Sequence, residues 1–65
     1  MLNLRDRRLE RNLTMREVAL QAGITEAMYS YIENGKRNPS VKKAKILGEI
    51  LDIDWTEFFE DRSAG

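Results

Sequence analysis

The feature that most constrains this chain is the very short link between two helical segments near its middle. Residues 15–22 carry four apolar side chains at the helical spacing i, i+3, i+4 and i+7, namely Met15, Val18, Ala19 and Ala22. Only Gly23 and Ile24 separate this segment from Thr25, a residue type that commonly caps helices. Because two residues with a glycine at the bend cannot return one helix antiparallel to the other, the two helices must cross steeply.

Capping signals mark both helices of this pair. Thr14 and Glu17 have the spacing of a capping box, in which each side chain accepts a hydrogen bond from a backbone N–H at the helix start. Gly23 supplies the left-handed residue that ends the first helix. The second helix is predicted from Thr25 to about Glu33. Steep crossing leaves its N-terminal half protruding, as in a helix-turn-helix.

Helical periodicity continues on both sides of this pair. A first helix is predicted over about 2–11, and Pro39-Ser40 opens a fourth. The inward face of this fourth helix is predicted to hold Val41, Ala44, Leu47, Gly48 and Leu51. Since glycine inside a helix costs about 1 kcal/mol relative to alanine, Gly48 indicates that another helix crosses closely there. Weaker breaks fall at Asn12 and Asp52.

A short aromatic segment completes the predicted bundle. Asp54 and Glu57 repeat the capping-box spacing. The aromatic residues of this fifth helix are Trp55, Phe58 and Phe59. The predicted fold class is all-α, a compact bundle of five short helices whose second and third members form the helix-turn-helix. Residues 1–60 are expected to make one domain, and 61–65 a frayed tail.

Several classes of function need residue types that this chain lacks. Without cysteine or histidine in 65 residues there is no thiolate zinc site, no thiol nucleophile and no imidazole base. Helix capping accounts for two members of the carboxylate clusters, which are Asp52/Asp54 and Glu57/Glu60/Asp61. The loop 35–37 lacks the spacing of a Walker phosphate loop. No apolar run approaches the ~20 residues of a membrane span. We expect a cytoplasmic, non-enzymatic protein without metal, cofactor, small-molecule substrate or membrane contact.

The formal net charge of +0 hides a segregation along the chain. Residues 1–16 carry five cations against two acids, and 17–35 carry three acids and no cation. Residues 36–45 then carry five cations and no acid, whereas 49–65 carry six acids against one cation. Such zoning either steers one face toward a polyanion or only solvates a small domain.

Several of these stretches resemble a known family. They are Leu13-Thr14, Val18-Ala19, Gly23-Ile24-Thr25 and Tyr31 to Ser40, which reads YIENGKRNPS. They resemble the lambda-repressor-like, Cro-type (XRE-like) helix-turn-helix domains of bacterial and phage regulators, from about Leu4 to Phe59. The resemblance implies a transcriptional repressor in the bacterial cytoplasm, associated with the nucleoid. It would bind double-stranded DNA as a homodimer on inverted half-sites ~34 Å apart, with the third helix in the major groove.

The resemblance also assigns roles to individual residues. Those implied to face the bases are Thr25, Glu26, Ala27, Met28 and Tyr31. Those implied to contact phosphates are Met15, Arg16, Asn34, Lys36, Arg37 and Asn38. Apart from any resemblance, backbone N–H groups and two cations converge beyond the bend at Gly35, which suits a phosphate. Arg8 and Glu33 resemble an ion pair that ties the first helix to the end of the third, the alternative being ordinary exposed charges.

The third helix departs from the family pattern, because 25–34 contains no cation. Glu26 either accepts a hydrogen bond from a cytosine amino group or only complements the helix dipole. Ala27 and Met28 offer apolar contact, at best with a thymine methyl group, and Tyr29 is expected in the core. Phosphate affinity then rests on Arg16, Lys36 and Arg37, with Lys42 or Lys43 as further candidates.

Two functions of different classes therefore stay open. A DNA-binding regulator would need a dimer contact from Ile46, Ile50 and the segment 52–59, unless these residues pack within one molecule. The alternative is an antitoxin-like or regulatory protein-binding module that keeps the fold but reads DNA weakly or not at all. Its support is the cation-free third helix, the two tyrosines and the acidic C-terminal segment.

Overall fold

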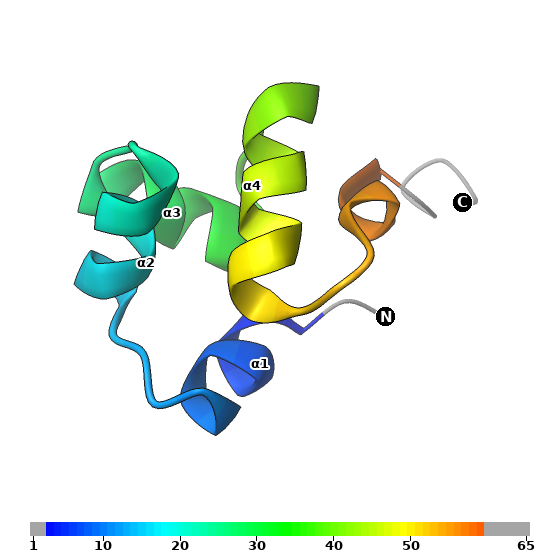
Figure 1. The fold of residues 1–65 in the computed structure, drawn as a ribbon. Coiled ribbons are helices and arrows are strands. Elements are labelled where there is room, and N and C mark those ends of the chain that lie inside the picture. Colours follow the sequence, from blue (N-terminus) through cyan, green and yellow to red (C-terminus); the bar gives the residue numbers. More distant parts are fainter. Residues whose placement is uncertain (1–2, 60–65) are drawn as a thin grey trace.

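A computed structural model describes residues 3–59 of the chain, in which helices are joined by short turns and no strand is present. The elements are α1 (Leu4–Glu10), α2 (Met15–Ala22), α3 (Glu26–Glu33), α4 (Val41–Leu51) and the 3₁₀ helix η1 (Trp55–Phe59). Figure 1 shows α4 standing between the α2–α3 pair and η1, with α1 below. Since α4 packs on α1, α2 and η1, it is the centre of the bundle. The predicted frayed tail, 61–65, lies outside the described residues.

Every α-helix begins at a short polar residue that caps it. The N-caps are Asn3, Thr14, Thr25 and Ser40. At α2 the capping box is confirmed, because Glu17 N–H donates to Thr14 Oγ1 at 3.0 Å and Thr14 N–H donates to Glu17 Oε1 at 2.8 Å. These side chains satisfy N–H groups that the helix itself cannot pair.

Each α-helix is followed by a residue in the left-handed region. Gly23 and Gly35 have φ of 73° and 75°, and Asn12 and Asp52 both have φ of 57°. Glycine, asparagine and aspartate adopt this conformation at least cost, so the breaks visible in the sequence are the places where the chain turns. After Gly23 the chain enters α3 within two residues, and α2 and α3 pack together as a helix-turn-helix.

The core is built from small and aliphatic side chains together with two aromatic residues, Tyr29 and Phe58. The most completely buried large side chains are Tyr29, Leu47, Leu51 and Val18, so the expected core position of Tyr29 is confirmed. The predicted inward position of Val41 is wrong, because 51% of this residue is exposed. Val41 lies on the correct stripe but in the first turn of α4, which projects past the neighbouring elements (Figure 1).

The C-terminal segment differs from the prediction in its helix type and its cap. It forms a 3₁₀ helix, and the Asp54 carboxylate accepts hydrogen bonds from Thr56 N–H at 3.0 Å and Thr56 Oγ1 at 2.7 Å. The predicted capping box with Glu57 is therefore replaced by a tighter turn, whose hydrogen bonds lower the pKa of Asp54. The close approach expected at Gly48 is present, but it comes from the returning backbone. A Cβ atom there would lie 2.9 Å from the Ile53 carbonyl oxygen.

Candidate nucleic-acid interface

The leading turn of α3 presents an exposed surface. Glu26 and Ala27 are exposed, and Tyr31, one turn beyond Ala27, has 47% of its surface exposed. Thr25 is exposed, but its Oγ1 already accepts a hydrogen bond from Met28 N–H at 3.0 Å. Met28 is half-buried against the core, so only part of its side chain faces outward. Of the five residues assigned to base readout, three are thus freely presented.

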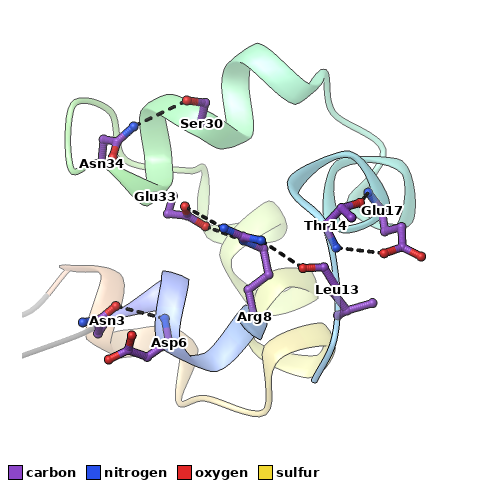
Figure 2. A network of polar contacts seen from close by, with 9 residues as sticks. All are labelled: Asn3, Asp6, Arg8, Leu13, Thr14, Glu17, Ser30, Glu33 and Asn34. Carbon is purple, nitrogen blue, oxygen red and sulfur yellow. Dashed lines mark hydrogen bonds and ion pairs between the residues drawn. The ribbon is translucent and has the colours of Figure 1, made fainter. Parts of the chain in front are cut away.

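The start of α2 offers backbone donors and one cation. Helix geometry leaves the N–H groups of Met15 and Arg16 without partners inside the helix. The side chain of Arg16 is exposed, whereas that of Met15 is half-buried against the core. The Glu17 carboxylate lies at the same helix end, where it accepts from Thr14 N–H (Figure 2). An anion approaching this end would meet free N–H groups beside a negative charge.

The loop that follows α3 is tied back to the exposed tyrosine. The carbonyl oxygen of Tyr31 accepts from Lys36 N–H at 2.8 Å and from Arg37 N–H at 3.3 Å. Gly35 N–H donates to the Ile32 carbonyl at 3.1 Å, which completes a Schellman cap. The exposed side chains of this loop are Asn34, Lys36, Arg37 and Asn38. The backbone of the two cationic residues Lys36 and Arg37 is therefore hydrogen-bonded directly to α3.

Arg8 reaches from α1 to the far end of α3 (Figure 2). Its Nε donates to Glu33 Oε1 at 2.8 Å and its Nη2 to Glu33 Oε2 at 3.2 Å. Nη1 donates to the Leu13 carbonyl at 2.9 Å. The ion pair is bidentate and nearly buried, and the hydrogen bonds that Arg8 donates to Glu33 raise the pKa of Arg8. Arg8 thereby joins α1, the linker residue before the N-cap of α2, and α3.

The hydroxyl of Tyr29 lies near this ion pair. Tyr29 is fully buried, and its hydroxyl has no hydrogen-bond partner among the described residues. Burial, and secondarily the negative charge of Glu33, raise the pKa of Tyr29 well above its ordinary value. The sequence assigned Tyr29 to the core but carried no signal for an unpaired polar atom there.

Lys43 makes a contact within the protein that the sequence did not predict. The sequence indicates Lys43 as a phosphate candidate beside Lys42, but Lys43 Nζ donates to the Ala22 carbonyl oxygen, at the end of α2, at 3.0 Å. One feature of the sequence does indicate such a contact. The last turn of α2 contains no basic residue, so its C-terminal carbonyls can accept a cation from another element. Lys42, by comparison, is exposed.

This arrangement suits a binding surface, because cations lie on the loop after α3 and at the start of α2. Within residues 3–59, no three potential metal-ligating side chains gather closely enough to hold a metal ion. Over the same residues, no helix has the length and apolar character needed to span a membrane.

Comparison with known sequences agrees with this geometry. A family model described as helix-turn-helix matches residues 4–58. The chain is 53% identical over 58 residues to YqaF, an uncharacterized HTH-type transcriptional regulator of Bacillus subtilis strain 168. The matched part covers 89% of this chain and 76% of the relative.

Solved structures share the fold. The N-terminal DNA-binding domain of SinR from Bacillus subtilis matches with a TM-score of 0.73 and 23% identity, over 92% of this chain and 88% of that one. A chain of the SinR–SinI complex matches with a TM-score of 0.74 and 22% identity, over 94% of this chain. The present chain spans 60% of the length of that second structure.

Proposed function

The chain belongs to the XRE-type helix-turn-helix family of DNA-binding transcriptional regulators, and on this premise we propose that it is a repressor that binds a specific operator as a dimer. In this proposal α3 enters the major groove of double-stranded DNA. The operator is an inverted repeat whose half-sites lie ~34 Å apart. A bacterial cytoplasmic location follows from this role.

The observation that carries the proposal is the link between the exposed face of α3 and the cationic loop. The Tyr31 carbonyl accepts from the N–H groups of Lys36 and Arg37, so the backbone that carries the loop cations is tied to the helix that would read the bases. Phosphate contacts set the position of a protein on DNA, and base contacts set its sequence preference. Because the loop is joined to α3, phosphate contacts made by the loop would set the register of α3 on the bases.

Base readout in this proposal is led by polar and apolar groups rather than by arginine. Tyr31 offers a hydroxyl, and Ala27 and part of Met28 offer apolar contact to a thymine methyl group. Glu26 accepts from a cytosine amino group or complements the dipole of α3. Phosphates are contacted by backbone N–H groups at Met15 and by the exposed residues Arg16, Asn34, Lys36, Arg37 and Asn38.

Dimerisation is part of the proposal because a module of this size rarely reaches useful affinity alone. The candidate contact lies on α4 and η1, where Ile46 and Ile50 are half-buried and Phe59 has 39% of its surface exposed. These residues already pack partly on the core, so the contact would use their outer surfaces. Sedimentation of the protein with and without operator DNA measures this step.

Selection of bound duplexes from a random pool tests the proposal. We expect an enriched inverted repeat, and a binding constant that falls steeply as the salt concentration rises. The amide resonances of residues 25–37 should shift when the selected duplex is added. Failure to enrich any sequence, together with unshifted amides at low salt, would contradict DNA binding.

A second function is favoured by one specific observation. The exposed surface of α3 carries no cation, and Tyr31 on this surface exposes 47% of its area. Tyrosine is enriched at protein interfaces, so this face also suits a protein partner. Binding to such a partner would respond weakly to salt, in contrast to binding through phosphates.

A further inference from the structure

We propose that Lys43 is a positioning residue for DNA recognition, which caps α2 from α4 and thereby sets the angle at which α3 leaves the turn. The inference rests on the proposed function for its effect on DNA, but the contact itself is testable without DNA. Lys43 Nζ donates to the Ala22 carbonyl at 3.0 Å, although the two residues are 21 positions apart. Lys43 is therefore engaged inside the protein rather than free to meet a phosphate.

The chemistry of both helix ends favours this contact. The last carbonyls of a helix have no partners within it and carry the negative end of the dipole. The last turn of α2 has no basic residue, and Lys43 supplies the missing cation. Lys43 is the third residue of α4, an end where a cation is disfavoured by that helix's own dipole. The carbonyl of Ala22 offsets this cost.

The turn at Gly23 leaves space for the ammonium group of Lys43. A Cβ atom on Gly23 would lie 3.2 Å from Lys43 Nζ, closer than an ordinary contact. Glycine is favoured at this position because of its φ of 73°, and the absence of a side chain also leaves room for the lysine. The N–H groups of Gly23 and Ile24 donate to Leu20 and Ala19 carbonyls at 3.2 and 3.0 Å. The hydrogen bond from Lys43 to Ala22 adds a contact from α4 to this two-residue turn. The geometry of the turn determines the direction of α3.

The test compares Lys43→Met with Lys42→Met, a neighbouring exposed lysine with the same charge and the same unfavourable helix end. In Lys43→Met, the amides of Gly23 and Ile24 should exchange with solvent about tenfold faster. The preference for the selected duplex over a random duplex should fall about fivefold, with the salt dependence of binding unchanged. Lys42→Met removes a candidate phosphate contact, so it is free to lower overall affinity and the salt slope, but it should leave turn exchange and sequence preference as in the wild type. Lys43→Arg should keep turn exchange and sequence preference at their wild-type values.

The wild-type protein provides a measurement that does not depend on a variant folding. The ammonium resonance of Lys43 should be detectable by ¹⁵N NMR because its protons are protected by the Ala22 carbonyl, whereas that of Lys42 should exchange too rapidly. The proposal is overturned if both resonances behave alike, or if Lys43→Met lowers the salt slope by about one and leaves turn exchange unchanged, as a phosphate contact would. If no duplex is selected at all, the proposed function fails, and the exchange data still decide whether Lys43 caps α2.

Discussion

The Nε atom of Arg8 and the Oε1 atom of Glu33 lie 2.8 Å apart across 25 positions of sequence, nearly out of contact with water. This pair joins α1 to the last turn of α3, the helix that would read the bases. Each charge is costly to bury, and each is tolerated because the other is present. The orientation of α3 therefore depends on a contact from α1, a helix to which no base or phosphate contact is assigned.

Removing one member of this pair should be far more damaging than removing both. Arg8→Met leaves the Glu33 carboxylate buried and unpaired, and we expect a loss of about 3–5 kcal/mol in the free energy of unfolding. The double substitution Arg8→Met with Glu33→Leu should recover most of that loss. Urea-induced unfolding measures both. The neighbouring Arg7→Met, which removes an exposed pair with Glu10, should change stability by less than about 1 kcal/mol.

Tyr29→Phe should be neutral or slightly stabilising at neutral pH, because it removes a buried hydroxyl that lacks a partner. The folded state raises the pKa of Tyr29 above its ordinary value of 10.0. The unfolded chain therefore loses this proton first, so wild-type stability should fall as the pH rises above 10. The phenylalanine variant should show a shallower fall. Identical alkaline profiles by urea unfolding would show that the hydroxyl is not held in its neutral form.

Gly48→Ala should destabilise the protein, although glycine-to-alanine changes inside helices ordinarily stabilise. The new Cβ would meet the Ile53 carbonyl at 2.9 Å and Trp55 Cβ at 3.2 Å, so we expect a loss of about 1–3 kcal/mol. Trp55 fluorescence reports displacement of η1, and thermal unfolding reports the loss. The adjacent exposed substitution Glu49→Ala serves as the control. A gain in stability for Gly48→Ala would mean that η1 packs less closely than described.

Arg37→Ala should weaken binding nearly equally to the selected duplex and to random duplexes. Loss of one phosphate contact should also reduce the slope of log K against log salt by about one. Fluorescence anisotropy over a salt series measures both quantities. Arg11→Ala is the matched control, since Arg11 is an exposed arginine that lies 3.9 Å from Asp52 rather than in the loop after α3. Equal effects of the two changes would indicate a general charge effect.

Tyr31→Ala should instead change which sequences are preferred. Its ring and hydroxyl are exposed on α3, where they can touch base edges. Repeating the selection with the variant should yield a different preferred base at one position of each half-site. Tyr31→Phe separates the contribution of the hydroxyl from that of the ring. If the alanine variant loses the same factor on selected and random duplexes, Tyr31 does not read bases.

Local features of the fold were predictable because they depend on residues close together in the chain. Thr14 and Glu17 are three positions apart, and Gly23 and Gly35 act through their own backbone freedom. The same local logic failed at Val41, because burial of a stripe position depends on whether a neighbour reaches it. The fifth helix also differed, since the Asp54–Thr56 hydrogen bonds compete with the expected capping box.

The amino-acid sequence by itself determined the caps at the start of α2, α3 and α4 and the breaks that follow the α-helices, and hence the helix-turn-helix and the exposed start of α3. Helix caps and left-handed turns depend on interactions between residues only a few positions apart, so short sequence patterns specify them. Only the tertiary structure decided that Lys43 contacts Ala22 and that the hydroxyl of Tyr29 is left unpaired beside a buried ion pair. Those relationships depend on how α1, α2 and α4 pack in three dimensions, where a shift of about 1 Å decides whether a hydrogen bond forms.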